Sequence, residues 1–71
     1  SYTTVKILIV STGIAQEHVI YHGMETMYPT IQIRDLVTDT LIFADSRPVD
    51  SNHTRILLGA PQALRVIFRG D

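Results

Sequence analysis

Cysteine is absent from this 71-residue chain, and histidine is scarce and scattered. Without cysteine no disulfide can stabilise the fold, and the three histidines are too few for a convincing structural zinc site. No apolar run approaches the ~18 residues that suggest a membrane-spanning helix. The opening residues, 1–6, lack the charged and apolar regions of a signal peptide. These absences make a cytoplasmic protein the simplest expectation.

The apolar content, in contrast, is ample. Hydrophobic residues make up 45% of the chain, which indicates a globular protein and argues against intrinsic disorder. We expect a single domain over residues 1–71. A chain of ~60 residues buries only about 60% of its unfolded surface, so its stability is marginal. Dimerisation is a common way to stabilise so small a domain, and we expect a homodimer.

Charge is distributed unevenly along the chain, although the net charge is only −1. Residues 1–46 carry two basic side chains against five acidic ones, whereas residues 47–71 carry four arginines against two aspartates. Arginine is suited to bidentate recognition of phosphates and bases. A solvated sheet face explains the same surplus equally well.

Several segments have the pattern of β-strands. Residues 5–10 form an apolar, β-branched run typical of a buried strand, and residues 30–36 alternate between apolar and polar side chains. A further β-like run covers residues 40–44, and the turn formers of residues 45–52 indicate a loop. Two strands follow at residues 54–59 and 64–69, separated by a Gly-Ala-Pro-Gln turn. Their apolar faces would be buried and their arginines would lie outside.

Residues 15–28 change period. Apolar or small side chains recur there with a spacing near 3.6 residues, which predicts an amphipathic helix that ends before Pro29. The competing interpretation makes residues 18–22 a strand. On a helix, His18 and His22 would share one face at a spacing that zinc sites use, but a structural zinc usually needs four ligands. Two histidines on a solvated face explain the pattern better, and we predict no metal site.

The later half of the chain resembles a known family. Residues 37–69 are similar to the CsrA/RsmA (carbon storage regulator) family of translational regulators, and residues 7–11 look like that family's first strand. Asn52 and the Ala60-Pro61 pair give the match its specificity. The positions that fit the family's Asn-x-x-Arg to Val-x-Val pattern are Asn52, Arg55, Ile56, Leu58, Ala60, Pro61, Leu64 and Val66.

The resemblance implies a mainly β fold: a strand-swapped homodimer of antiparallel sheets, here with one inserted helix at about 15–28. It also implies a post-transcriptional repressor that binds single-stranded GGA motifs in messenger or small RNA, a mode suited to unpaired bases. The family's Arg-Arg pair after the first strand is replaced here by Thr12-Gly13. The candidate RNA-binding residues are Ser11, Arg55, Arg65 and Arg69.

Two alternatives remain open. A divergent member could act on another regulatory protein without binding RNA. The turn at residues 10–13, if it precedes a helix, could belong to a small α/β phosphate-binding domain. No Ser/His/Asp or paired-carboxylate arrangement stands out, so we predict neither an enzyme nor a cofactor.

Overall fold

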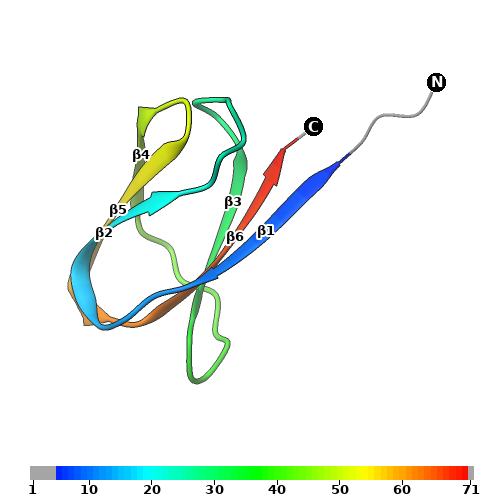
Figure 1. The fold of residues 1–71 in the computed structure, drawn as a ribbon. Coiled ribbons are helices and arrows are strands. Elements are labelled where there is room, and N and C mark those ends of the chain that lie inside the picture. The colour runs from blue at the N-terminus through cyan, green and yellow to red at the C-terminus, as the bar shows by residue number, and fades with distance from the viewer. Residues whose placement is uncertain (1–4, 71) are drawn as a thin grey trace.

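The computed structural model describes residues 5–70, and within this range the chain forms strands and no helix. Figure 1 shows the course of the chain through these strands. The strands are β1 (Lys6–Ser11), β2 (Ala15–Tyr21), β3 (Thr30–Asp35), β4 (Asp45–Asp50), β5 (His53–Gln62) and β6 (Leu64–Gly70). The part of the chain that the structure describes therefore offers no helix that could span a membrane.

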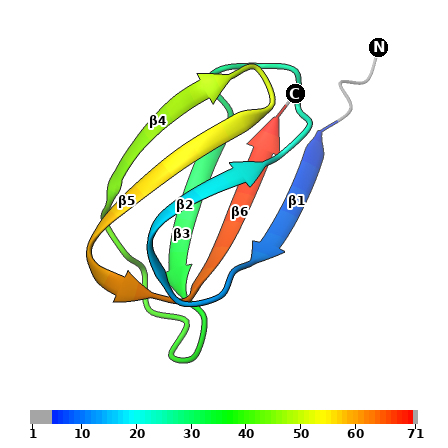
Figure 2. The same ribbon diagram turned by 60° about the vertical axis from the view of Figure 1, so that its left-hand side comes forward.

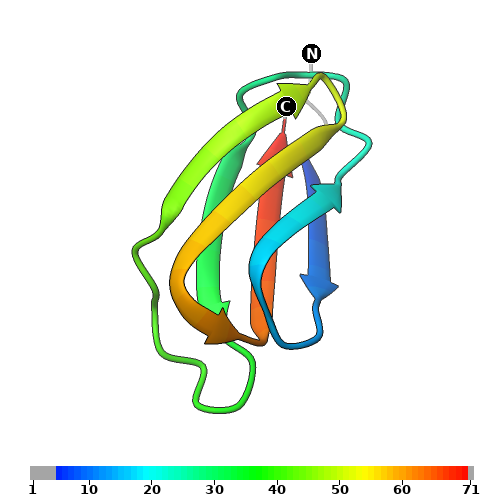
Figure 3. The same cartoon turned by 90° about the vertical axis from the view of Figure 1, so that its left-hand side faces the viewer.

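The strands form two antiparallel sheets of three strands each. Sheet A has the order β1-β6-β3, and sheet B has the order β2-β5-β4. Figures 2 and 3 show sheet B lying over sheet A, with β1 and β2 along one side and β3 and β4 along the other. Only Ala63 separates β5 from β6, so the chain passes directly from the centre of one sheet to the centre of the other.

The core lies between the two sheets and is built mainly from the central strands. Alternate residues of β5 and β6 point inward, as the period of a strand requires. Phe68 is fully buried opposite Leu8 of β1 and Ile31 of β3. The buried apolar residues are Ile20, Ile33, Ile56, Leu58, Leu64, Val66 and Phe68. The predicted strands at 54–59 and 64–69 and their buried faces are thus confirmed.

The predicted helix at 15–28 is wrong. Residues 15–21 form β2 instead, with His18 and Ile20 buried on its inner face while Val19 and Tyr21 point outward. His18 in the strand and His22 directly after it are polar but buried, and so they conceal the two-residue period of a strand. The strand ends where Gly23 adopts a φ of 65°, a conformation that glycine accepts without strain.

The predicted loop at 45–52 is also wrong over most of its length. Residues 45–50 form β4, an edge strand that carries Pro48. Proline is tolerated on an edge because a strand there can lack one ladder donor. The predicted β-run at 40–44 is not a strand, and only Leu41 pairs with Arg34 in an isolated bridge. The Gly-Ala-Pro-Gln segment forms the end of β5 rather than a separate turn.

The first strand is placed differently from the expectation in one respect. β1 was predicted to be buried, but it is an edge strand whose Ile7 and Ile9 are 64% and 59% exposed. It pairs with β6 of the same chain, with Lys6 opposite Gly70. The exchange of strands between two copies stays a prediction.

The core predicts the effect of a truncation at Phe68. Replacing a fully buried phenylalanine by alanine removes its packing and leaves a cavity, which should lower the free energy of unfolding by ~3–5 kcal/mol. Phe43→Ala is the matched control, because Phe43 is 91% exposed and should change stability by less than ~0.5 kcal/mol. Urea unfolding of both variants measures the difference. Equal losses would contradict the assigned core.

The burial of His22 predicts a pH dependence of stability. Its Nδ1 accepts a hydrogen bond from the Met24 amide at 3.1 Å, and its Nε2 has no partner among the described residues. Burial, and secondarily the charge of His53, lower the pKa of His22 below 6.5, while Asp50 opposes this shift. The unfolded chain then binds the proton more readily than the folded one.

Stability should therefore fall as the pH drops below 6.5, the ordinary value from which this pKa is lowered. Thermal unfolding between neutral pH and pH ~5 measures the loss. His22→Phe should flatten this part of the pH profile even if it lowers stability throughout. An unchanged slope in that variant would assign the titration to another group.

Candidate nucleic-acid interface

The outer face of sheet A carries three of the six lysine and arginine side chains of the chain. Residues opposite one another in the register of β1, β6 and β3 share this face. We call this surface the basic face. Its residues are Ile7, Ile9 and Ser11 of β1, Arg65, Ile67 and Arg69 of β6, and Thr30, Gln32 and Arg34 of β3.

Three of the four residues predicted to bind RNA lie on this face. Ser11 is the register partner of Arg65, and Arg69 lies four residues further along β6. At the rise of an antiparallel strand this separates the two arginines by about 13 Å along β6. The structure therefore brings Ser11, Arg65 and Arg69 onto one surface.

Arg55 lies elsewhere. It is on the outer face of sheet B, where it pairs with Glu17 through Nε and Oε1 at 3.1 Å and through Nη2 and Oε2 at 3.2 Å. Such a two-point ion pair neutralises the guanidinium and fixes its orientation. Arg47, the register partner of Arg55 on β4, is close to Asp45 at 3.5 Å. The arginines of sheet B thus have acidic partners of their own.

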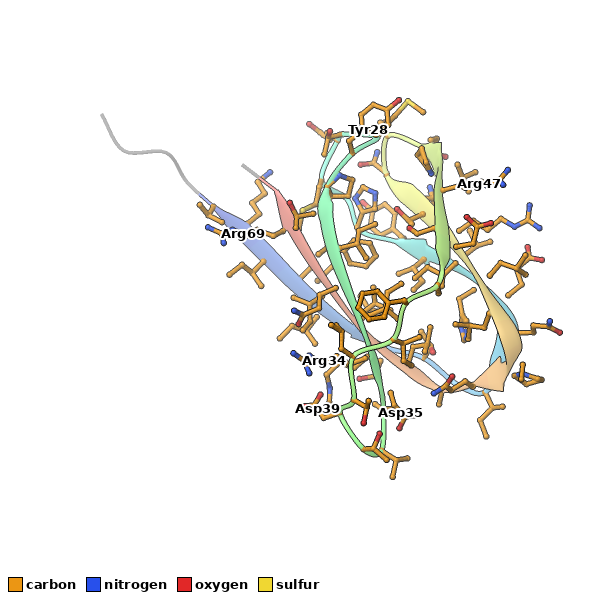
Figure 4. The ribbon with its side chains drawn as sticks, turned by 180° about the vertical axis from the view of Figure 1, so that it is seen from behind. Tyr28, Arg34, Asp35, Asp39, Arg47 and Arg69 are labelled. Carbon is orange, nitrogen blue, oxygen red and sulfur yellow. The ribbon has the colours of Figure 1, made fainter. Side chains whose placement is uncertain are left out.

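Arg34 belongs to the basic face although the sequence did not single it out. It lies on β3 directly opposite Arg65. The signal was present in the alternation of residues 30–36, where Gln32 and Arg34 share the face opposite to Ile31 and Ile33. Figure 4 shows Arg34 and Arg69 on one side of the molecule and Arg47 on the other.

Asp39 holds the two facing arginines together. Its Oδ1 lies 3.1 Å from Nη1 of Arg65, and its backbone carbonyl accepts a hydrogen bond from Nη1 of Arg34 at 2.7 Å. Nε of Arg34 also donates to Oε1 of Gln32 at 3.0 Å. Asp39 has a φ of 61°, a left-handed conformation that aspartate adopts more readily than most residues. One acidic residue therefore offsets the repulsion between two register-paired cations.

Asp35 in turn fixes the loop that carries Asp39. Its Oδ1 accepts hydrogen bonds from the amides of Val37 and Thr38, both at 2.8 Å, and its Oδ2 accepts one from Nε2 of Gln62 at 2.6 Å. These donors, the Thr38 amide first among them, lower the pKa of Asp35 from 3.8 to about 2. The carboxylate thus ties the loop to the junction between β5 and β6.

At its other end the basic face borders an open depression of about 470 Å³. Arg69 lines it, and the guanidinium of Arg69 has no side-chain hydrogen bond or ion pair with residues 5–70. Tyr28 lies at the same depression and is 81% exposed. The remaining lining residues are Thr26, Pro29, Thr30 and Gly70. An exposed aromatic ring and a guanidinium that no described side chain engages therefore lie at one site.

The histidines are engaged separately within the part of the chain that the structure describes. Nε2 of His18 is 3.0 Å from the carbonyl of Gln62, and the ring of His22 packs against Phe68 with a centroid distance of 5.1 Å. Among residues 5–70 no three His, Cys, Asp or Glu side chains are grouped so that they could hold a metal ion.

The anion loop suggested for a small α/β domain is not formed either. The segment after β1 leads into β2, so the described part of the chain has no helix N-terminus to bind phosphate.

We compared the chain with protein families, curated proteins and solved structures. No protein-family model, curated protein or solved structure matches the chain.

The hydrogen bonds of Asp35 predict acid sensitivity in the loop that positions Asp39. Because the pKa of Asp35 is about 2 in the folded chain and 3.8 is its ordinary value, the stability that it contributes is complete above pH 3.8 and is lost as the pH falls toward 2. In Asp35→Asn the side-chain amide has a single acceptor oxygen, which cannot accept hydrogen bonds both from the loop amides and from Nε2 of Gln62. The stability of the variant at neutral pH should therefore be lower than that of the parent. The melting temperatures of variant and parent should then converge below pH 3.8. A constant difference over this range would contradict the assignment.

Proposed function

We propose that this domain binds single-stranded RNA on the basic face of sheet A. The observation that carries the proposal is that Arg34, Arg65 and Arg69 lie on one surface of sheet A. Asp39 neutralises only one of these three positive charges. The arginines of sheet B, in contrast, each face a carboxylate. Arginine pairs readily with phosphate oxygens, and release of counterions from the RNA backbone supplies a large share of the affinity in such contacts.

An unpaired base has a place beside this surface. Sequence-specific proteins recognise RNA mainly through unpaired bases that stack on aromatic rings or guanidinium planes. The depression between Tyr28 and Arg69 offers both groups. Ser11, Thr30 and Gln32 add hydroxyl and amide groups that can contact base edges or the 2′-hydroxyl. We assign phosphate contacts to Arg34 and Arg65 and base contacts to Tyr28 and Arg69.

The biological role that we propose follows from the resemblance to the carbon storage regulators. A domain that holds a GGA-containing loop in a messenger RNA hinders the ribosome and represses translation. The contacts differ from those of the family, since Thr12-Gly13 replaces the Arg-Arg pair after the first strand. In our proposal the arginines of β6 and β3 supply the electrostatic attraction to RNA in place of that pair. Arg55 is left out of the site because it lies on the outer face of sheet B, away from the basic face.

The test is an RNA-binding titration of Arg65→Ala/Arg69→Ala over a range of salt concentrations. The probes are short hairpins with and without GGA in the loop. Each lost phosphate contact to a single strand should reduce the slope of log K against log salt by about 0.7. A lost base contact should cost ~1–3 kcal/mol and should relax the preference for the GGA loop.

The charge-matched control is Arg47→Ala/Arg55→Ala, which removes two arginines from sheet B. It should leave affinity and salt slope unchanged, because these side chains lie on the opposite face. Equal losses in the two double variants would reduce the interaction to net charge and refute the site. Binding to neither hairpin set by the parent protein would refute the RNA function and leave a protein-interaction module.

A further inference from the structure

The free edges of the two sheets are protected very unequally. An unpaired edge strand is a template for pairing with another strand, and proteins usually block it with charge, proline, bulges or a covering segment. The outer edge of β3 is covered over its second half, where the amide of Ile42 donates to the carbonyl of Ile33 at 2.8 Å and that of Asp35 to Thr40 at 2.8 Å. β3 is therefore largely closed to a partner.

Both edges of sheet B carry blocking features. β4 contains Pro48, the charged residues Asp45 and Arg47, and a register shift near Asp50. β2 contains Glu17 and a register shift between Ala15 and Glu17. A bulge bends the strand and interrupts the regular ladder that a partner would need.

β1 has only one of these features, the charged Lys6 at its first position. Residues 7–11 contain no proline and no charged side chain, and their register with β6 is unbroken. Ile7 and Ile9 are 64% and 59% exposed on the outer face. An edge strand with four consecutive apolar residues, Ile7 to Val10, is the kind of edge that folded proteins normally protect.

The hydrogen-bond phase of β1 shows which backbone groups face outward. The Thr12 amide donates to the Leu64 carbonyl at 2.9 Å, and the register continues without a shift to Lys6 opposite Gly70. Because narrow and wide pairs alternate in an antiparallel ladder, even-numbered residues of β1 direct their amides and carbonyls toward β6. The amides and carbonyls of Ile7, Ile9 and Ser11 therefore point to the open edge.

We propose that β1 pairs antiparallel with β1 of a second copy of this chain, about a two-fold axis at Leu8. The two copies of sheet A then form one continuous sheet. Ile7 of each copy lies opposite Ile9 of the other on the outer face, and the outward amides and carbonyls of both strands meet. This pairing differs from a strand exchange, because each β1 keeps its partner β6.

Charge does not oppose a second copy as the occupant, and the outward backbone groups of Ile7 and Ile9 are complementary to those of an identical strand. Lys6 is the only charge on β1, and the two-fold axis places the two lysines at opposite ends of the paired strands. The nearest arginines are on β6, so those of the two copies are three strand spacings apart, or about 14 Å. Their repulsion is screened at a Debye length of about 8 Å in physiological salt. Nothing in β1 repels its own copy.

The size of the contact sets its strength. A strand of six residues buries less surface than the ~1,200–2,000 Å² of a stable interface, so the dimer should be weak and concentration-dependent. The consequence for RNA, which rests on the proposed function, is that two basic faces become one surface. A strand that contacts both copies then gains affinity through effective concentration.

Analytical ultracentrifugation of the protein without RNA, from micromolar to millimolar concentration, tests the pairing. The parent chain should pass from monomer to dimer, and Ile9→Pro should remain monomeric. The Ile9 amide faces the open edge, so this proline removes no bond to β6. Ile7→Lys is the second variant, which should also abolish the dimer and covers the case in which the proline variant does not fold.

Val49→Lys is the matched control, because it places the same charge on the blocked edge strand β4, and it should dimerise like the parent. A monomer at millimolar concentration, or a dimer that Ile9→Pro and Ile7→Lys leave intact, would overturn the proposal. The second result would favour strand exchange or another surface. RNA titration of a monomeric variant separates the two hypotheses: failure to dimerise should lower the apparent affinity without abolishing binding to one basic face.

Discussion

The burial of the apolar inner faces of β5 and β6 is the constraint on which the rest of the structure depends. These consecutive strands lie at the centres of the two sheets and supply most of the fully buried side chains. Every other strand pairs with one of them. Because inward and outward residues must alternate, burying Val66 and Phe68 places Arg65 and Arg69 on the outside. The same alternation that builds the core therefore builds the basic face.

The sequence predicted the central part of this arrangement and missed its periphery for identifiable reasons. The alternation of Ile56, Leu58, Leu64, Val66 and Phe68 is strong because these five inward residues are all aliphatic or aromatic. In β2 the inward His18 is polar, and His22, which is also buried, follows directly after the strand; these two residues hide the two-residue period of a strand and mimic a helical one. In β4 all residues are exposed, and an edge strand made of Pro, Asp, Ser and Arg has the composition of a loop. A strand that buries few side chains shows little alternation of apolar and polar residues in its sequence.

The candidate interface was predictable to a similar degree. The outward arginines of β6 follow from the strand period alone. That Arg55 belongs to the other sheet does not, because the change of sheet between Gln62 and Leu64 depends on a bend in the backbone. Arg34 was visible as an outward residue, but only the pairing of β3 with β6 places it beside Arg65. The role of Asp39 depends on a left-handed loop conformation that no periodicity encodes.

The pairing of β1 with β6 also constrains the order of folding. The turn between Asp50 and His53 joins β4 and β5, which are neighbours in sequence and in sheet B. Closing sheet A requires Lys6 to meet Gly70, and the chain entropy lost in closing so long a loop must be offset by contacts that form only afterwards. We expect the β4–β5 hairpin to form early and β1 to join last. During synthesis the apolar side chains of β1 would then stay exposed until β6 has left the ribosome.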